Sequence, residues 1–338
     1  MSSGLTPAAR ADRAFAPVAQ AVVAGRSPGA VLGVIAAEGA RAVRAAGWAQ
    51  VVPVRRPMTR DTWFDLASLT KPVFTARRIL DHAAAGRISL DAPLTTLLPD
   101  LRQYEPGAWE RRVTFRQCLG HETPFPAVVP LYTLNRDPDL LRAHVLQNDW
   151  RAGPAVYSDI NYILLGLALE RMEKRRIRQM DPGPGFAWAA DPAQAAATED
   201  CTWRNRVICG EVHDDNCDAL QGAGHAGLFG TADSLLDFAH GLLTGTAAAP
   251  ETIAWMRAPL SAQRTHGWQR SHMGWPGGDH ASPGTIGHTG FTGTGLWVDF
   301  DRGHAWALLT NRIHPTRHFD SGIVDLRRAV GDLVNEGA

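Results

Sequence analysis

Segments typical of β-strands lie at both ends of this chain, and a long, proline-rich and partly helical middle separates them. Near the N-terminus, two stretches at 30–36 and 41–48 flank the dipeptide Glu38-Gly39, which predicts a hairpin. Near the C-terminus, three short apolar stretches separated by glycine-rich or Asp-Arg-Gly turns lie at 285–288, 295–300 and 304–310. This order predicts an α+β fold with one antiparallel sheet built from both termini and flanked by helices.

The residues between these two sets of strands predict an inserted, mainly helical lobe. We expect one domain over 1–338, in which 1–87 and 218–338 form an α/β lobe and 88–217 form the helical lobe. Apolar periodicity and capping residues predict helices at 7–24, 68–86, 161–174, 231–243 and 320–334, and a surface loop at 180–198. An active site is expected in the cleft between the lobes.

Composition narrows the classes of partner. The 34 acidic residues balance the 34 Lys and Arg residues, so no overall field favours nucleic acid or an anionic membrane surface. The sequence contains no apolar stretch of membrane-spanning length and no secretion pattern at its start, so we expect a cytoplasmic protein. Small-molecule substrates remain, and the oligomeric state is left open.

The four cysteines are too few for a disulfide scaffold in a chain of 338 residues. Cys201, Cys209 and Cys217 are evenly spaced, with His213 between them, but their spacing matches none of the short ligand pairs typical of zinc. We expect neither a metal nor a cofactor, and interpret 213–215 (His-Asp-Asp) as structural hydrogen-bonding residues rather than as a metal site or part of a triad.

Lys71 stands out because the chain has only one other lysine, Lys174, among its 34 basic residues. Three residues before it lies Ser68, in a segment that begins a predicted helix. Positions i and i+3 share one helix face, so the amine can reach the serine hydroxyl and activate it as a nucleophile. The alternative is an ordinary surface lysine in an arginine-rich chain.

A second candidate group is Tyr157, one of only four tyrosines, just before the helix at 161–174. A phenol near a lysine ammonium can be partly phenolate and can serve as a general base for a serine hydroxyl. Taken alone, Tyr157 could equally be a buried aromatic residue that precedes a capped helix.

A third candidate is the glycine-rich segment 284–295, in which Gly287-His288-Thr289-Gly290 follows a strand. Glycines allow backbone amides to approach a substrate, and an edge strand can offer an amide to a developing oxyanion. A simple hairpin would also explain the segment. Trp268, Trp275 and Trp297 lie close to it in sequence and are expected in the core and in the pocket wall.

In this order, the SxxK, Tyr-Ser-Asp and His-Thr-Gly segments resemble those of the serine β-lactamase and penicillin-binding-protein superfamily. The branch that the chain resembles most is class C β-lactamases with their esterase and D-aminopeptidase relatives, and the resemblance extends from about residue 15 to the C-terminus. It implies a β-lactamase/transpeptidase-like fold and acyl transfer through an acyl-serine.

The resemblance also implies roles for particular residues. Ser68 would be the nucleophile, Lys71 the amine that activates it, and Tyr157 the group that moves the proton to the leaving group. The oxyanion would be bound by the backbone amides of Ser68 and Phe291. Four residues would contact the substrate: Asp159, His288, Thr289 and Gly290.

Departures from the family pattern shape the expected substrate. Asp159 replaces the usual Asn and adds a possible negative charge beside the substrate, and His288 replaces a lysine that helps to hold a substrate carboxylate. The segment 171–187 also looks shortened, which leaves the pocket rim undefined. We therefore expect weak capture of carboxylates and weak or absent β-lactamase activity.

The leading hypothesis is a serine hydrolase acting on a small ester or amide through Ser68, like a β-lactamase-like esterase. A second is a β-lactamase, or a peptidase for D-amino-acid or peptidoglycan-derived amides. A third, from another class, is a non-catalytic penicillin-binding or acyl-ligand sensor. Trapping an adduct without turnover would favour the sensor, whereas comparison of D-Ala peptides with esters separates the enzymes.

Overall fold

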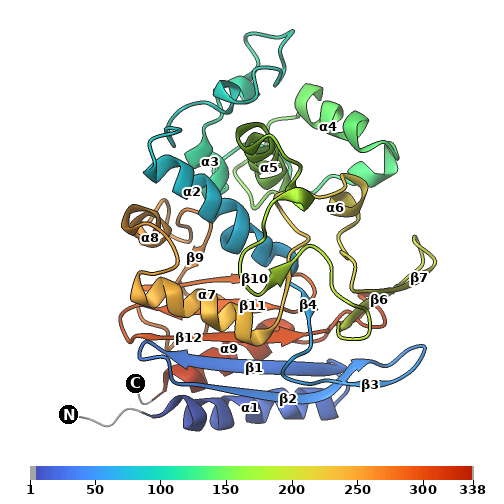
Figure 1. Cartoon of the computed structure of the whole chain (residues 1–338), viewed down its shortest axis with the longest axis vertical. Coiled ribbons are helices and arrows are strands. Elements are labelled where there is room, and N and C mark those ends of the chain that lie inside the picture. The colour runs from blue at the N-terminus through green and yellow to red at the C-terminus, as the bar shows by residue number, and fades with distance from the viewer. Residues whose placement is uncertain (1–4, 337–338) are drawn as a thin grey trace.

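A seven-stranded antiparallel sheet forms one end of the molecule in the computed structural model, which describes residues 5–336 (Figure 1). Its strands, in spatial order, are β3 (Arg56–Pro57), β2 (Arg41–Gln50), β1 (Gly29–Ala36), β12 (His304–Thr310), β11 (Gly295–Asp299), β10 (Thr285–Thr289) and β9 (Gln269–Arg270). β1 pairs with β12 from Ala30↔Thr310 to Ala36↔His304. The predicted sheet built from both termini is therefore confirmed.

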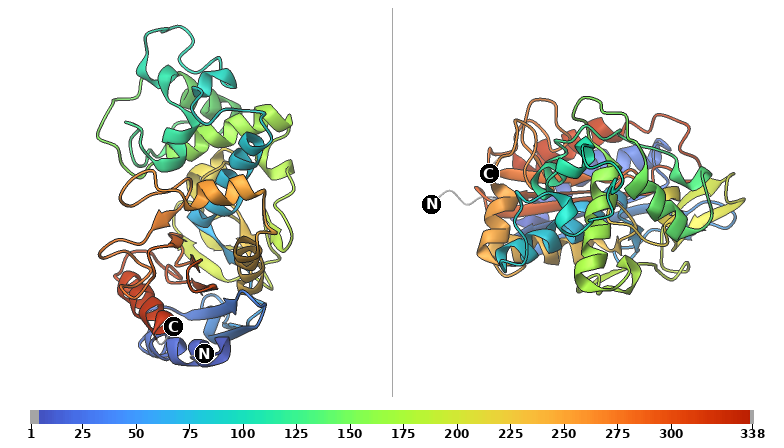
Figure 2. Two further views of the ribbon diagram at one scale, coloured as in Figure 1. Left: turned by 90° about the vertical axis from the view of Figure 1, so that its left-hand side faces the viewer. Right: turned by 90° about the horizontal axis from the view of Figure 1, so that it is seen from above.

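Both faces of this sheet are covered by helices, as the continuous apolar sequence of β1 requires. Alternate side chains of β1 point to opposite faces: Leu32 and Val34 pack in a cluster with α1 (Pro7–Val23) and α9 (Ile323–Asn335), whereas Val31 and Ile35 join the main core with α7 (Ala232–Thr244). Figures 1 and 2 show α1 and α9 on the outer face and α7 on the inner face. Three of the predicted helices thus enclose the sheet.

The opposite end of the elongated molecule is mainly helical (Figure 2). It contains α2 (Arg77–Ala84), α3 (Phe115–Gly120), α4 (Pro138–Gln147), α5 (Asp159–Glu173) and α6 (Asp215–Ala219), while α8 (Pro250–Arg257) packs beside α2. The apolar periodicity of its sequence predicts that α5 buries one face, but in the structure every residue from Ile160 to Leu169 is buried. A helix that is apolar on all sides belongs in a core, and α5 lies at the centre of this lobe. The lobe boundaries at 87 and 217 stay a prediction.

Short strand pairings that sequence periodicity did not reveal connect the two ends. β8 (Phe229–Gly230) pairs with both β4 (Phe64–Asp65) and β5 (Phe186–Ala187), and β6 (Ala197–Cys201) forms a hairpin with β7 (Arg206–Cys209). The expected surface loop at 180–198 therefore contains β5 and the start of β6, with Ala195, Ala196 and Ala197 buried. Strands of two residues are too short to show a period of two.

The helix predicted at 68–86 is irregular at its start. Residues Ala67–Leu69 form a 3₁₀ turn, Lys71–Ala76 a π-helical turn, and only Arg77–Ala84 a regular α-helix. Pro72 supplies no backbone N–H, which helps to explain why regular helical pairing begins late. Ser68 thus lies on a 3₁₀ turn and Lys71 begins a wider π-helical turn, and π-helical turns are frequent at functional sites.

Three tryptophans near the glycine-rich segment do not shape a pocket. Trp268, Trp275 and Trp297 are each 1% exposed, and Trp297 stacks on Trp306 with ring centroids 3.9 Å apart. The prediction that they lie in the core is confirmed, whereas the prediction that they line a pocket is wrong. Among residues 5–336, no helix combines the length and the apolar character that crossing a membrane would need.

Candidate active site

A cleft of about 630 Å³ lies where the sheet meets the helical lobe. Its lining includes seven of the residues singled out from the sequence: Ser68, Tyr157, Asp159, His288, Thr289, Gly290 and Phe291. Lys71 is fully buried beneath them. Segments from both ends of the chain and from its middle therefore meet at one place, as a shared site requires.

The Lys71 amine has three acceptors around it. It lies 2.9 Å from Ser68 Oγ, 2.8 Å from Asp159 Oδ1 and 3.1 Å from the carbonyl oxygen of His225. Burial alone lowers the pKa of Lys71, but the negative charges of Asp159 and Tyr157 outweigh burial and raise it above its ordinary value. Lys71 is therefore a buried ammonium ion held against the serine hydroxyl.

The backbone just before Ser68 is strained and is held in place by a buried carboxylate. Ala67 has a φ of 49°, in the left-handed region that residues with a Cβ rarely adopt. Asp65 Oδ1 accepts the N–H of Ala67 at 2.8 Å, and Asp65 Oδ2 accepts the N–H of His213 at 2.7 Å. The orientation of Ser68 is thus fixed by the surrounding fold rather than by local preference.

Tyr157 is surrounded by cations and by neutral rings. Lys71 Nζ lies 5.0 Å and Arg264 Cζ 5.2 Å from its ring centroid, and the rings of His121 and His288 lie 4.4 Å and 6.0 Å away. Burial, together with the nearby Lys71 and Arg264 charges, lowers the pKa of both histidines well below their ordinary range, so both are neutral at pH 7. Tyr157 therefore lies close to two cations and two neutral imidazole rings.

The turn after β10 is tied to the segment that carries Ser68. Thr292 Oγ1 donates to the carbonyl oxygen of Asp65 at 2.8 Å, and Thr294 Oγ1 donates to that of Leu66 at 3.0 Å. Arg327, buried in α9, donates to the carbonyl of Gly290 at 2.9 Å. Within residues 5–336 the N–H of Phe291 has no hydrogen-bond acceptor, which leaves it free for a ligand oxygen.

The glycines of this segment serve packing more than substrate approach. A Cβ on Gly287 or Gly295 would collide with the indole ring of Trp297, and one on Gly290 would collide with Thr294 Oγ1 and the carbonyl of Leu66. The sequence interpretation of these glycines as a path to the substrate is therefore wrong for Gly287 and Gly295. Their small size lets Trp297 lie flat against the sheet.

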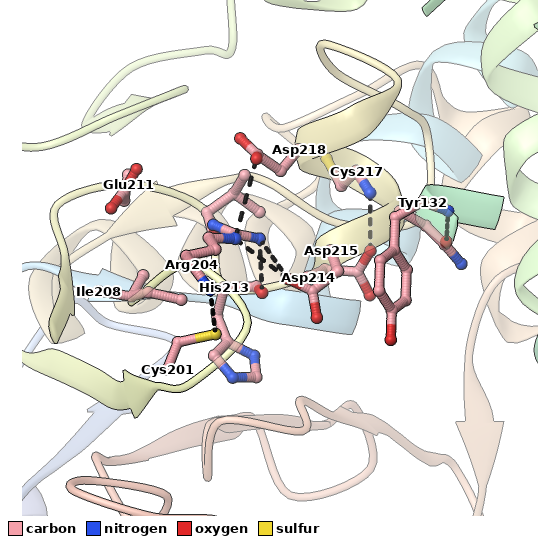
Figure 3. Close-up of polar contacts among 12 residues, drawn as sticks. Tyr132, Cys201, Arg204, Ile208, Glu211, His213, Asp214, Asp215, Cys217 and Asp218 are labelled. Atoms are coloured by element: carbon pink, nitrogen blue, oxygen red, sulfur yellow. Dashed lines mark hydrogen bonds and ion pairs between the residues drawn. The ribbon is translucent and has the colours of Figure 1, made fainter. Parts of the chain in front are cut away.

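One wall of the cleft carries His213, Asp214 and Asp215, whose contacts Figure 3 shows. Arg204 lies 2.9 Å from Asp215 and donates to the carbonyl of His213 at 3.0 Å. Asp214 Oδ1 caps α6 by accepting the N–H of Cys217 at 2.8 Å, and lies 2.9 Å from His225 Nε2. These contacts are the structural hydrogen bonds that the sequence interpretation assigned to 213–215.

Asp159 does not present a free charge to the substrate, contrary to the sequence-based expectation. Its carboxylate forms an ion pair with Lys71, so the two charges cancel beneath the cleft. Among residues 5–336, one group of three side chains has donor atoms close enough to share a metal ion, namely Asp159, Asp214 and His225, whose atoms lie within 4.8 Å of one another. Lys71 already supplies the cation for this group.

Arginines in the cleft were missed by the sequence interpretation. Arg264, Arg312, Arg317 and Arg327 all line it, and only Arg317 has a carboxylate partner within 4.0 Å in residues 5–336, which is Glu199 at 2.5 Å. Burial lowers the pKa of Arg264 and Arg312, as expected for guanidinium groups without a counter-ion. No motif marks these positions, because an arginine in a loop has no sequence signature.

Comparison with known proteins gives a consistent result across the chain. The Beta-lactamase family model matches residues 12–329. An N-acetylmuramyl-L-alanine amidase of Bacillus subtilis (strain 168) is 29% identical over 317 residues, which is 77% of this chain and 71% of the relative. A putative D-alanyl-D-alanine carboxypeptidase of Salmonella typhimurium is 26% identical over 316 residues, 78% of this chain and 72% of the relative.

Two solved structures show the same fold at low identity. EstCE1, described as a hydrolase with promiscuous acyltransferase activity, has a TM-score of 0.71 and 21% identity, covering 96% of this chain and 98% of its own. A class C β-lactamase from Rhodobacter sphaeroides has a TM-score of 0.70 and 19% identity, with the same coverage of 96% and 98%. The resemblance indicated by the three sequence segments is confirmed.

Proposed function

Because the chain belongs to the Beta-lactamase family, whose members are serine hydrolases, we propose that it hydrolyses a small ester or amide through an acyl intermediate on Ser68. The observation that carries this proposal is the contact of 2.9 Å between Lys71 Nζ and Ser68 Oγ at the floor of the cleft. A buried amine directed at a serine that follows a strained residue is an arrangement suited to nucleophilic catalysis.

The proposed reaction has two stages. Ser68 Oγ attacks the substrate carbonyl while its proton passes to the Tyr157 phenolate, and the resulting oxyanion accepts hydrogen bonds from the N–H groups of Ser68 and Phe291. Tyr157 then gives this proton to the leaving alcohol or amine as the bond between the carbonyl carbon and the leaving group breaks. In the second stage water attacks the acyl carbon, and the Tyr157 oxygen takes a proton from that water. Tyr157 then gives the proton to Ser68 Oγ as the bond between Oγ and the acyl carbon breaks, which releases the acid.

The charge of the cleft points to an anionic substrate. Arg264, Arg312 and Arg327 have no carboxylate partner within 4.0 Å in residues 5–336. Of the three aspartates that line the cleft, Asp159 and Asp215 are paired with Lys71 and Arg204, and Asp214 lies 2.9 Å from His225 Nε2. A partly buried cation without a counter-ion is unfavourable, and a substrate carboxylate would relieve that cost. A neutral His288 cannot form an ion pair with a substrate carboxylate. In this proposal Arg264, beside Tyr157, forms that ion pair instead.

A second candidate function is hydrolysis of an amide derived from peptidoglycan. It is favoured by the curated relatives, which are named as an amidase of N-acetylmuramyl-L-alanine and as putative carboxypeptidases for D-alanyl-D-alanine. Fragments of this kind are small amides rich in carboxylates, and a cleft with surplus guanidinium charge suits them. β-Lactams are expected to be poor substrates because their carboxylate would have to be held by Arg264, beside Tyr157, rather than by a cation at position 288, where a neutral histidine replaces the family lysine.

The test is labelling and turnover with matched variants. A fluorophosphonate should add one phosphonyl group at Ser68, located by mass spectrometry of peptides, and a chromogenic short-chain ester should be hydrolysed. Ser68→Ala should abolish both. Hydrolysis that survives Ser68→Ala removes Ser68 from its role, and a stable adduct without turnover of any ester or amide points instead to an acyl-ligand sensor. Fast hydrolysis of nitrocefin would overturn the expectation for β-lactams.

A further inference from the structure

We propose that Asp159 is a positioning residue that keeps Lys71 an ammonium ion throughout the reaction, so that Lys71 serves as a fixed hydrogen-bond donor and charge and never as the base. The inference rests on the proposed role of Ser68 as nucleophile. It concerns the aspartate that replaces the usual asparagine at 159, and it assigns that carboxylate a part in catalysis without contact with the reacting atoms.

The contacts around Lys71 Nζ include an ion pair with a carboxylate. An –NH₃⁺ group has three donors and no acceptor, and Nζ has three acceptors at hydrogen-bond distance: Ser68 Oγ at 2.9 Å, Asp159 Oδ1 at 2.8 Å and the His225 carbonyl at 3.1 Å. Two of these, the carboxylate and the carbonyl, cannot donate. A neutral amine could donate to these two and accept from the Ser68 hydroxyl, so the contact that favours the ammonium is the one of 2.8 Å with the Asp159 carboxylate.

The charges near Lys71 come from several elements. The ring centroids of Tyr157 and Tyr162 lie 5.0 Å and 5.9 Å from Lys71 Nζ. The other groups that face Lys71 are Ser68, the backbone of His225, Asp159, Asp214, His121 and His288. Burial raises the pKa of Tyr162 and lowers those of the two histidines, so all three are neutral near pH 7. The carboxylates left opposite the ammonium are those of Asp159 and Asp214.

Among these anions, Asp159 is the one in direct contact. Asp214 is held elsewhere, since its Oδ1 accepts from Cys217 and lies 2.9 Å from His225 Nε2. Asp159 has 16% of its side chain exposed, and its Oδ1 approaches Lys71 from the start of α5. Replacing this carboxylate with an amide would keep the shape but leave the ammonium desolvated without its nearest counter-ion.

A permanent ammonium decides where the Ser68 proton goes. When Ser68 Oγ accepts a hydrogen bond from Lys71, its own proton is directed away from the amine, and in the proposed reaction that proton passes to Tyr157. During the attack the O–H bond of Ser68 breaks, the proton joins the phenolate oxygen, and the electron pair of Oγ forms the bond to the carbonyl carbon. Lys71 loses no proton at any step and stabilises the negative charge that develops on Oγ.

The two-lysine composition makes this directly measurable. The protein is produced with [6-¹³C]lysine, which yields resonances for Lys71 and Lys174 only, and Lys174→Arg identifies which is which. We expect the Lys71 resonance of the wild type to stay at its ammonium position from about pH 6 to about pH 10, past the point where a free lysine begins to titrate. In Asp159→Asn it should titrate within that window.

The kinetic readout is the rate of Ser68 labelling by a fluorophosphonate as a function of pH. If the ammonium is required, Asp159→Asn should gain an alkaline limb, with the rate falling about tenfold for each pH unit above the point at which Lys71 loses its proton. Faster labelling of Asp159→Asn as Lys71 deprotonates would show that the neutral amine is the base and would overturn the inference. So would a wild-type Lys71 resonance that titrates below a free lysine.

These outcomes are separable from failure of the proposed function. Absence of Ser68 labelling in the wild type would defeat the role of Ser68 but leave the lysine titration intact. If Asp159→Asn does not fold, the wild-type resonance alone still decides whether Lys71 is an ammonium at neutral pH.

Discussion

The hydroxyl of Thr294 donates a hydrogen bond to the carbonyl oxygen of Leu66 at 3.0 Å, which ties the C-terminal half of the sheet to the turn that presents Ser68. Thr292 makes the matching bond to Asp65 at 2.8 Å. Both hydroxyls are buried, and together they fix the spacing between the N–H of Phe291 and Ser68. The two halves of the proposed oxyanion site, far apart in sequence, are held together by side chains rather than by strand pairing.

Removal of one of these bonds should lower activity more than stability. In Thr292→Val the carbonyl of Asp65 loses its donor, and we expect about 1 kcal/mol less stability toward urea. The rate of Ser68 labelling should fall about 30-fold, because a displacement of the oxyanion donors costs far more than the bond itself. Thr292→Ser keeps the hydroxyl and is the control. Equal labelling rates for the Thr292→Val and Thr292→Ser variants would show that the hydrogen bond to the Asp65 carbonyl is not needed for the reactivity of Ser68.

Much of the fold followed from the sequence where apolar runs were long. The strands at 30–36 and 304–310 were recognisable because each is continuously apolar, and both are buried on both faces. The pairings of Phe64–Asp65, Phe186–Ala187 and Phe229–Gly230 were not, since two-residue strands carry no period and their partners lie far apart in sequence.

The sequence allowed the proposed catalytic residues to be predicted, but not the ion pair and the arginine around them. Ser68, Lys71 and Tyr157 could be singled out because rare residues stood at helical spacing or beside a helix start. The ion pair between Lys71 and Asp159 could not be foreseen, because it depends on how α5 docks against the π-helical turn. Arg264 was invisible for a similar reason, since its position over Tyr157 is set by the path of a loop.

Arg264 should determine preference for charged substrates. We compare a pair of chromogenic substrates that differ only in carrying a carboxylate or a carboxamide, and measure the ratio of their kcat/KM values. Arg264→Gln should reduce this ratio about 10- to 100-fold, the usual strength of a charge-assisted hydrogen bond. Arg264→Lys keeps the charge and should retain part of the preference. A ratio unchanged in Arg264→Gln would place carboxylate binding elsewhere in the cleft.

Gly287 should tolerate no side chain. A Cβ there would overlap the indole of Trp297, which is 1% exposed and stacked on Trp306, so neither ring has room to move. Gly287→Ala is expected to cost about 3 kcal/mol in urea unfolding, at the upper end for overpacking of a core. Gly107→Ala, where a Cβ would meet no atom within 4 Å, is the matched control and should leave stability nearly unchanged. Similar losses in both would contradict the packing role.

Glu199 should make the stability of the protein depend on acid. It is buried, lies 2.9 Å from His213 Nε2 and pairs with Arg317. Burial raises the pKa of Glu199, but hydrogen bonds and charges from His213 and Arg317 lower it well below the ordinary 4.5. A carboxyl whose pKa is lower in the folded state contributes stability above its unfolded pKa and loses that contribution as the pH falls further.

The prediction compares urea unfolding of the wild type and Glu199→Gln at two pH values. At pH 7 the variant should be less stable by about 3 kcal/mol, since it leaves Arg317 partly buried without its partner. Below about pH 4 the difference in unfolding free energy between wild type and variant should become smaller. The reason is that Glu199 takes up a proton in the unfolded wild type at a pH where it is still ionised in the folded protein. Asp12→Asn, at an exposed ion pair with Arg44, is the control, and its unfolding free energy should differ little from that of the wild type at either pH. A Glu199→Gln gap that does not narrow with acid would mean that packing, rather than charge, holds this wall of the cleft.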